Sequence, residues 1–537
     1  MGSGVQPGLD QLDQVTHEGD WKVQRSTSSM ARGGGVGKER LCVAVPAVVV
    51  ALGLMAPSTA VADPGSESST GRAMDWQPCV QVAEGWDQQD KATECAMVEV
   101  PLDYAQPDGR TIRIAVSRIK ASDPAKRRGA LFINPGGPGT EGLTEPRRVL
   151  ASEMRDLGKR FDLVGFDIRG TGRSDKPGCP ELAFDNFPQP PAGLTGKERM
   201  KFLDEAYGKA LTTCANKEPD LSRSMTTVNA ARDMDRVRTA LGERKISYFG
   251  KSWGTALGAS YRSQFDARVD RMVLDSVITS WQSVDDAEAQ LAARQRRYQD
   301  FTAWMAERDD RLGLGRTAAD VSEKLLALRT ELEKHPRGSV TADTFNSHLL
   351  SPRARWASAA QALSDIAAGK TPTGALSPVP AMPTGNSPER GFGRPMQDGD
   401  MEFVLRAVNC NGASGQRDFE AGWEESLKDK QKYPVAGYAG GGTMQCSGWP
   451  FPGRHEQLGK GTSPLQLFGH AFETNTVLPR AQQMKQTVGG SLSIIKDDVH
   501  VSLQDLAAPA KDAVAFLTGR SGPFERSYDG KAVPDLE

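Results

Sequence analysis

A serine flanked by glycines is the first candidate for covalent chemistry. Residues 250–254 read G-K-S-W-G and follow an apolar run at 246–249. In this pattern the glycines relieve crowding at a sharp strand-to-helix turn, and the Ser252 hydroxyl stands at a helix N-terminus, whose dipole favours developing negative charge. With 56 glycines in 537 residues, the pattern alone is a weak signal. Its position after an apolar run predicts that Ser252 is a nucleophile for acyl transfer.

Such a serine needs a general base, and histidine is the usual one. His500 closely follows an apolar run at 492–495, where a strand would end. His470 directly follows another such run and is the competing candidate. The remaining histidines lie in segments that fit the role less well: His17, His335, His348 and His455. We therefore predict His500 as the general base.

The third member of the set is a carboxylate that orients the imidazole and stabilises its charged form. It should follow a late strand and precede the histidine in the chain. Glu473 lies just beyond the apolar run 465–468 and is the predicted acid. Asp275, at the end of an earlier strand, stays open as the alternative. Asp497 and Asp498 are interpreted as a solvated loop, because they lie too close in sequence to the histidine.

A second glycine-rich turn could stabilise negative charge. Residues 134–139 read N-P-G-G-P-G and follow the apolar run 130–133. Backbone N–H groups of such a turn can point at the oxyanion of a tetrahedral intermediate, with the amide of Trp253 as a second donor. The alternative is a plain surface turn.

Residues 167–174, D-I-R-G-T-G-R-S, follow a further apolar run. Their glycines and alternating charges indicate a tight, internally paired loop beside the site. We interpret this loop as structural support and not as a source of catalytic groups.

Apolar runs alternating with helical stretches must position these groups. The runs lie at 130–133, 163–166, 246–249, 272–274, 465–468 and 492–495. They predict a mostly parallel, doubly wound sheet of the α/β-hydrolase type. Residues 281–450 instead show helical spacing and a Pro/Gly/Ser-rich loop. We predict core segments at 75–280 and 451–537, with 281–450 as a helical cap. An independent helical domain is the alternative.

The N-terminus predicts export. Residues 30–62 combine basic residues, a short apolar run and a small-residue cleavage pattern, which are the features of a secretory signal peptide. Residues 1–29 are interpreted as an N-terminal extension, and 63–74 as a disordered segment or short propeptide. The even number of cysteines after residue 62 fits an exported protein. Of fifteen possible pairings, the sequential one closes the shortest loops and is our prediction: Cys79–Cys95, Cys179–Cys214 and Cys410–Cys446.

Charge and sequence motifs give no support for a nucleic-acid-binding, membrane-binding or metal-binding protein. The formal charge is −2, from 66 basic and 68 acidic residues, which gives no reason to expect binding to nucleic acid or to an anionic membrane. No C-x-x-C or H-E-x-x-H pattern suggests a metal site. We expect no cofactor, no metal and no membrane span in the mature protein.

Taken together, the motifs resemble the secreted tripeptidyl aminopeptidase group of the proline iminopeptidase family of α/β-hydrolases, over about residues 75–537. The turns at 134–139, 167–174 and 250–254 occur in family order, followed by C-S-G-W-P at 446–450. The resemblance implies a serine exopeptidase that removes short peptides, often tripeptides, from free N-termini. It also implies that the Gly137 and Trp253 amides form the oxyanion hole, and that Glu473 and His500 complete the triad.

The chain departs from this family in three places. Glu473 stands where the family usually has Asp, and Cys410 is followed by Asn411 where relatives often carry an acid. Glu141 lies beside the oxyanion turn, where Ser or Gly is more usual. An aminopeptidase needs a carboxylate for the substrate ammonium, and we hypothesise that Glu141 or a cap acid supplies it.

Two other functions remain open. A secreted carboxylesterase would use the same triad on an ester, because the fold hosts both chemistries. A non-catalytic binding protein could keep the scaffold, but the intact serine, histidine and oxyanion turn argue against it.

Overall fold

The computed structural model describes residues 74–194, 196–278, 284–370, 399–412, 415–438, 446–520 and 524–536. The predicted extension, signal peptide and nearly all of the 63–74 segment lie outside the described residues, as does the Pro/Gly/Ser-rich loop. Internal contacts divide the chain into Met1–Ser68 and Ser69–Glu537. The description below concerns the second unit.

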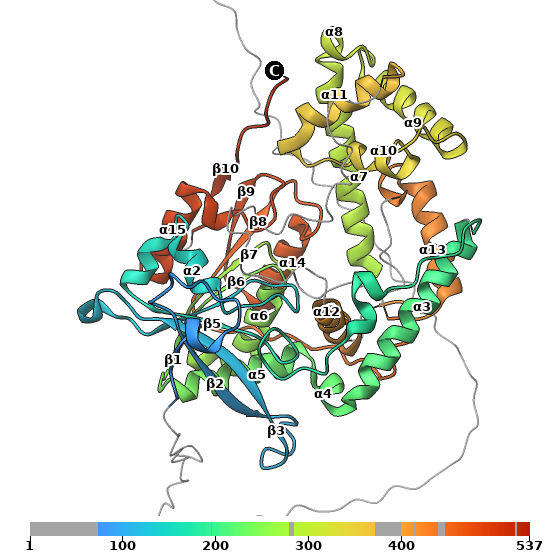
Figure 1. Ribbon diagram of the computed structural model, residues 1–537. Coiled ribbons are helices and arrows are strands. Elements are labelled where there is room, and N and C mark those ends of the chain that lie inside the picture. Colours follow the sequence, from blue (N-terminus) through green and yellow to red (C-terminus); the bar gives the residue numbers. More distant parts are fainter. Residues whose placement is uncertain are drawn as a thin grey trace, which may run out of the picture. The chain divides into compact units, whose positions relative to one another are not determined.

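A ten-stranded sheet carries the fold (Figure 1), in the order β1-β2-β3-β5-β4-β6-β7-β8-β9-β10. The strands are β1 Gln77–Pro78, β2 Glu94–Pro101, β3 Thr111–Ile119, β4 Ala130–Asn134, β5 Asp162–Phe166, β6 Ile246–Lys251, β7 Val269–Asp275, β8 Leu465–His470, β9 Ser491–Lys496 and β10 Ser527–Asp529. Pairing is antiparallel as far as the β3–β5 contact and parallel from β5 to β10. The predicted fold class is confirmed, and all six expected strands are present.

Fifteen α-helices are assigned within the described ranges. They are α1 Cys79–Val82, α2 Glu145–Leu150, α3 Gly196–Lys217, α4 Pro219–Ser224, α5 Thr227–Ala240, α6 Trp253–Phe265, α7 Val284–Ala306, α8 Asp309–Leu312, α9 Ala318–Lys334, α10 Ala342–Leu349, α11 Trp356–Ala367, α12 Asp400–Asn411, α13 Phe419–Lys432, α14 Leu478–Val488 and α15 Ala507–Leu517. None of the described helices has the length and apolar character needed to cross a membrane.

Alternate residues of the central strands face two different layers of the core. In β4, Phe132 belongs to one apolar cluster, which also takes residues from α5, α6 and α14. Its neighbours Leu131 and Ile133 belong to a second cluster, to which α2 and α15 contribute. Helices therefore cover both faces of the sheet, which explains why its parallel strands are continuous apolar runs in the sequence.

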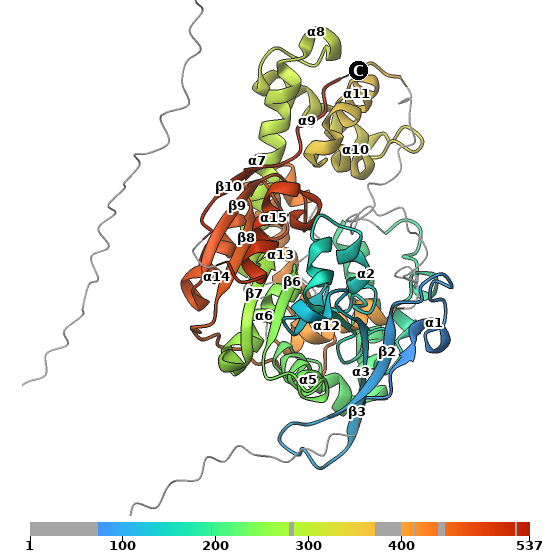
Figure 2. The same cartoon turned by 90° about the vertical axis from the view of Figure 1, so that its left-hand side faces the viewer.

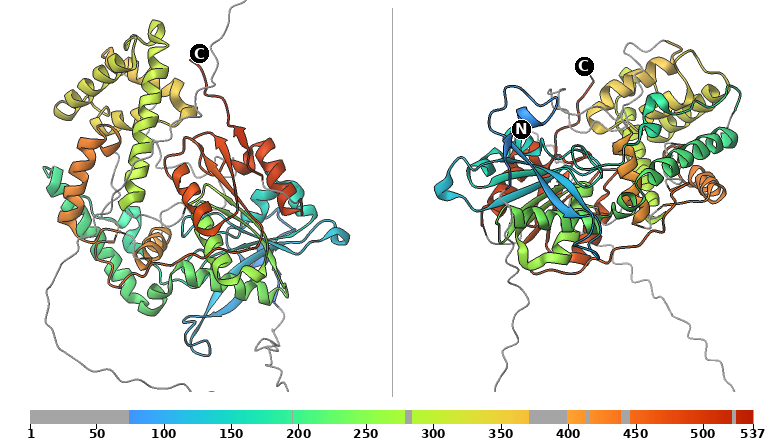
Figure 3. Two further views of the ribbon diagram at one scale, coloured as in Figure 1. Left: turned by 180° about the vertical axis from the view of Figure 1, so that it is seen from behind. Right: turned by 60° about the horizontal axis from the view of Figure 1, so that its bottom comes forward.

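A helical insertion comes between β7 and β8. Helices α7 to α11 bury an apolar cluster of their own, which includes Phe301, Leu325 and Trp356. Figures 2 and 3 show α8, α9, α10 and α11 grouped beside α7. Helix α12 differs, since Phe403 and Ala407 belong to a cluster of the sheet core. The sheet-forming sequence is thus split as expected, while the boundaries 281–450 stay a prediction.

All three predicted disulfides are present. Cys79–Cys95, Cys179–Cys214 and Cys410–Cys446 have Cα–Cα distances of 4.9, 5.4 and 5.6 Å. The third bond joins α12 to the segment that leads back into the sheet. Pairing between near neighbours in sequence is confirmed.

Candidate active site

Ser252 occupies the turn between strand β6 and helix α6. Its backbone has φ 54° and ψ −126°, a conformation that side chains rarely adopt. The flanking glycines make this turn possible. A Cβ on Gly250 would lie 2.4 Å from the Gly254 carbonyl oxygen, and a Cβ on Gly254 would lie 2.8 Å from Asn134. The G-x-S-x-G pattern is therefore required by close backbone packing.

The Ser252 side chain stands at the N-terminus of α6 and is 5% exposed as a residue. Its backbone N–H donates to the Asp275 carbonyl oxygen at 2.9 Å, which fixes the turn to the end of β7. Among the described residues, the Ser252 hydroxyl makes no hydrogen bond. The backbone bond to Asp275 therefore positions the predicted nucleophile, whose hydroxyl need not be hydrogen-bonded before substrate binds.

Glu473 and His500 form a hydrogen-bonded pair on neighbouring loops, after β8 and after β9. The His500 Nδ1–H donates to Glu473 Oε1, which also accepts the Thr476 N–H at 3.3 Å. Burial by itself raises the pKa of Glu473. The charge and hydrogen bond of His500, with smaller effects of His470 and Thr476, outweigh it, so the pKa lies below its usual value. The predicted acid and base are thus in contact, with the acid ionised.

The end of β7 connects this pair to the nucleophile. The Ser276 hydroxyl donates to Glu473 Oε2 at 3.1 Å and accepts the Val501 N–H at 2.8 Å. The preceding residue, Asp275, accepts the Leu503 N–H at 3.3 Å through Oδ2. Sequence reasoning missed Ser276, because a serine after a strand has no distinguishing pattern.

Backbone strain is concentrated at the same place. Among the described residues, the non-glycine residues with positive φ are Ser252, Ser276 and Val501, at 54°, 55° and 58°. Such conformations cost about 1 kcal/mol or more each and persist only where the surroundings enforce them. All three residues belong to the linked loops described above, which marks these loops as the candidate functional site.

The glycine-rich turn lies directly against the nucleophile. A Cβ on Gly136 would lie 2.6 Å from the Lys251 carbonyl oxygen and 2.9 Å from the Ser252 Cβ. Neither the Gly137 nor the Trp253 N–H donates to an acceptor in the described part of the chain. Two unpaired amides beside a serine hydroxyl can stabilise an oxyanion.

The competing histidine, His470, belongs to a second, fully buried network. Its Nδ1 lies 2.6 Å from Asp497 Oδ1, and its Nε2 lies 2.9 Å from Asp275 Oδ1. Burial lowers the pKa of His470, but the two carboxylates raise it more, to well above its usual value. Both ring nitrogens therefore donate, and the ring is a cation. Asp275, the alternative acid, contacts this histidine.

The interpretation of Asp497 and Asp498 as solvated is wrong, since they are only 5% and 8% exposed. Asp497 Oδ2 accepts the Ser502 hydroxyl at 2.7 Å. Asp498 Oδ2 accepts the Arg353 N–H from the helical insertion at 2.8 Å. Both carboxylates bind groups from other segments, which a local sequence pattern does not reveal.

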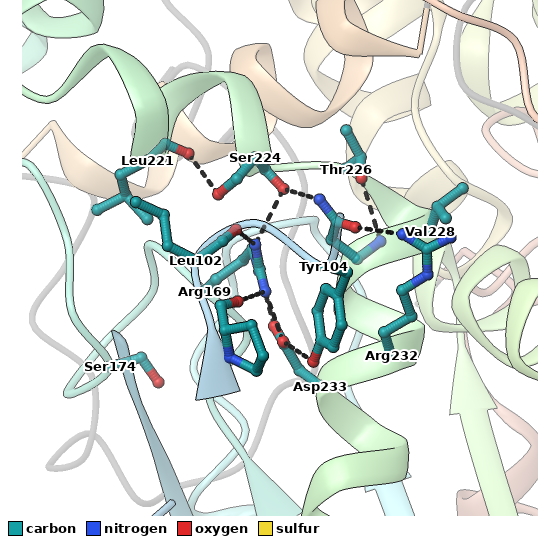
Figure 4. A network of polar contacts seen from close by, with 12 residues as sticks. Leu102, Tyr104, Arg169, Ser174, Leu221, Ser224, Thr226, Val228, Arg232 and Asp233 are labelled. Atoms are coloured by element: carbon teal, nitrogen blue, oxygen red, sulfur yellow. Dashed lines mark hydrogen bonds and ion pairs between the residues drawn. The ribbon is translucent and has the colours of Figure 1, made fainter. Parts of the chain in front are cut away.

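The loop at 167–174 is internally paired as expected, since Asp167 accepts the Arg173 N–H at 2.9 Å and the Ser174 hydroxyl at 2.7 Å. It also pairs with other segments. Arg169 is buried and pairs with Asp233 of α5 at 2.6 and 2.7 Å, and Tyr104 donates to the same carboxylate (Figure 4). Asp167 accepts the Gly142 N–H at 2.7 Å, close to the oxyanion turn. Burial, the largest effect, raises the pKa of Asp167 to about 6.

Glu141 closely follows the oxyanion turn in sequence, and its side chain lies beside the 167–174 loop. Its carboxylate is 3.8 Å from Arg173. Both residues line a cavity of about 860 Å³, together with Trp86, Met97 and other residues of the N-terminal strands. Ser252 is not among the lining residues. The role of Glu141 in binding substrate stays a prediction.

One group of residues in the described ranges has the spacing of a metal site. Ligand atoms of Cys179, Glu181 and Cys214 lie within 4.8 Å of one another. The two cysteines are joined in a disulfide, and a metal requires thiolates. The oxidised protein therefore cannot use this group as a metal site.

Comparison with protein families agrees with the fold. A family model described as alpha/beta hydrolase fold matches residues 129–368, a range that contains the oxyanion turn and the Ser252 elbow. In members of this fold that carry the G-x-S-x-G turn, the serine is the nucleophile and is served by a later acid and histidine. The chain is accordingly a serine hydrolase of the α/β-hydrolase class.

Similar proteins of known name show to which group of α/β-hydrolases the chain belongs. A tripeptidyl aminopeptidase of Streptomyces coelicolor is 32% identical over 446 residues, which cover 79% of each chain. The serine protease Hip1 of Mycobacterium tuberculosis is 26% identical over 85% of this chain and 91% of its own. A carboxylesterase B from the same species is 29% identical over 57% of this chain and 62% of its own. The chain belongs to the tripeptidyl aminopeptidase group of the α/β-hydrolase family.

Proposed function

We propose that this protein is a secreted serine exopeptidase that releases short peptides, principally tripeptides, from free N-termini. One observation carries the proposal. The chain is 32% identical to a tripeptidyl aminopeptidase, and its hydrogen-bonded Glu473–His500 pair lies on loops that bond to the end of β7. The same end of β7 accepts the backbone N–H of Ser252. The helical insertion would limit how much of the substrate N-terminus fits.

The proposed reaction proceeds through an acyl-enzyme. Because the Nδ1–H of His500 is donated to Glu473, Nε2 is free to take the Ser252 proton as the hydroxyl attacks the scissile carbonyl. The Gly137 and Trp253 amides stabilise the oxyanion, a contribution of about 3 kcal/mol for one such donor. His500 then protonates the leaving amine, and water releases the acyl group by the same route.

Secretion is proposed on two grounds. Residues 30–62 have the composition of a signal peptide. Three disulfides in one chain are typical of proteins that fold in an oxidising compartment. Edman sequencing of the protein recovered from culture medium tests this, and an N-terminus upstream of residue 62 would contradict it.

The substrate ammonium requires a carboxylate, and Glu141 is our candidate. Glu141→Gln should lower kcat/KM for free N-termini and so reduce the discrimination against acetylated peptides. If Glu141→Gln keeps full discrimination for free N-termini, a carboxylate of the insertion takes this role.

The decisive experiment compares three substrates with the purified protein. They are one tripeptide p-nitroanilide with a free N-terminus, the same peptide acetylated, and a short-chain p-nitrophenyl ester. The proposal expects strong hydrolysis of the free peptide alone. Ser252→Ala is the control and should lose both activity and labelling by a fluorophosphonate probe. Equal rates on free and acetylated peptides would contradict exopeptidase activity.

A carboxylesterase is the second candidate. It is favoured by the similarity to a carboxylesterase B over 57% of the chain, and the triad serves esters equally well. A preference for the ester in the same experiment, with Ser252 labelled, would establish it.

A further inference from the structure

One face of helix α7 lies on the two loops that carry Glu473 and His500. Gln290 Nε2 donates to the Asn475 carbonyl oxygen at 2.8 Å, two residues beyond the acid. About two helical turns later, Arg297 Nη1 lies 3.5 Å from Oδ2 of Asp498, which precedes the histidine by two residues. Positions 290, 294 and 297 share one helix face. Arg294 is therefore placed between these two contacts.

A second segment of the insertion adds positive charge to the same region. The Arg353 backbone N–H donates to Asp498 Oδ2 at 2.8 Å. Its guanidinium lies 3.6 Å from the centre of the Phe472 ring, next to the acid in sequence. Arg353 pairs with Asp300 at 2.9 Å. Of the cations here, Arg297 and Arg353 have carboxylate partners.

Arg294 differs from both, because within the described residues no carboxylate, carbonyl or hydroxyl accepts a hydrogen bond from its guanidinium. Burial, and then the neighbouring charge of Arg297, lower the pKa of Arg294 from its usual value. A partly buried cation beside a like charge is unfavourable until an anion is bound.

We propose that Arg294, assisted by Arg297, is a subsite for a carboxylate of the substrate. The proposal rests on the peptidase function above and specifies its substrate class. Peptides offer two such carboxylates, an acidic side chain near the scissile bond and the C-terminal carboxylate of a short peptide. Either would pair with the guanidinium of Arg294 through charge-assisted hydrogen bonds.

Two sets of substrates distinguish these sources. The first is a trialanine p-nitroanilide with a free N-terminus, in which each alanine is replaced in turn by glutamate or by its neutral isostere glutamine. The second is tetraalanine with a free or an amidated C-terminus, followed by chromatography. We expect a preference of about tenfold in kcat/KM for the carboxylate in one of the sets.

The variant Arg294→Gln should abolish this preference, chiefly through KM, and should not lower the melting temperature, because it removes a repulsive charge. Arg296→Gln is the matched control, since Arg296 lies on the same helix but is exposed. Added salt should weaken the preference in the wild type. The subsite is refuted if the wild type shows no preference in either set, or if Arg294→Gln retains it.

Failure of the peptidase function is detected separately. If neutral peptides are not cleaved while Ser252 is labelled and esters are hydrolysed, the function is wrong. The subsite is then tested with p-nitrophenyl butyrate and mono-p-nitrophenyl glutarate. If Arg294→Gln changes kcat/KM for the two esters by the same factor, the subsite is refuted as well.

Discussion

Replacing His470 by glutamine tests the buried network most directly. The change removes one cation that serves two carboxylates, since Asp275 and Asp497 lie 2.9 and 2.6 Å from its ring nitrogens. Both aspartates stay buried, and breaking a buried pair in this way costs about 3–5 kcal/mol. For a folded unit of this size the entropy of unfolding is about 1 kcal/mol/K, so the melting temperature should fall by roughly 3–5 °C.

The pH dependence of this loss has a definite sign. The folded-state pKa of His470 is raised above the unfolded value of 6.5. Its contribution to stability is therefore complete below that unfolded value and is lost as the pH rises through the raised folded-state pKa. The gap between wild type and His470→Gln, measured by calorimetry from acidic to alkaline pH, should be largest at the acidic end.

The same variant should alter the pH profile of catalysis. The charge of His470 helps to lower the pKa of Glu473. Without that charge the pKa of Glu473 should rise towards its usual value, and the acidic limb of kcat/KM should move to higher pH. His455→Gln is the control, because His455 is exposed. Equal melting curves and equal acidic limbs for the two variants would refute a cationic His470.

Two further changes test the candidate site. Glu473→Gln should lower kcat by about a thousand- to ten-thousand-fold without unfolding the protein, because His500 loses its ionised partner. Steady-state kinetics measure this loss. A loss of less than about tenfold would mean that another group is the acid. Gly254→Ala would place a Cβ 2.8 Å from Asn134 and should cost about 1–3 kcal/mol. The control is Gly459→Ala, where a Cβ meets nothing within 4 Å. Calorimetry compares the two variants, and equal melting temperatures would contradict the packing argument.

The sequence was sufficient to predict the parallel part of the fold, since strands buried on both faces leave continuous apolar runs such as the one in β4. Short or alternating strands such as β1 and β10 leave no such signal, and these were not predicted. The candidates for the acid and the base could be narrowed from the sequence, because chain order and strand ends restrict them strongly. The contact between Glu473 and His500 is consistent with those predictions.

The groups that hold the site together were not predictable. Ser276 acts through a hydroxyl that bonds to Glu473 and Val501, and many strands end in a small polar residue. The pairing of His470 with Asp275 and Asp497 joins the ends of three neighbouring strands, β7, β8 and β9. Such contacts depend on the order of strands in space, which local spacing does not encode.

The junction at the end of β7 has a consequence for the native ensemble. One dipeptide, Asp275–Ser276, bonds to the nucleophile through its backbone and to the acid and histidine loops through its side chains. Local opening at this point would release all three loops together. Amide hydrogens of Ser252, Val501 and Leu503 should then exchange as one cooperative group, so molecules with an assembled nucleophile and a displaced base would be scarcely populated.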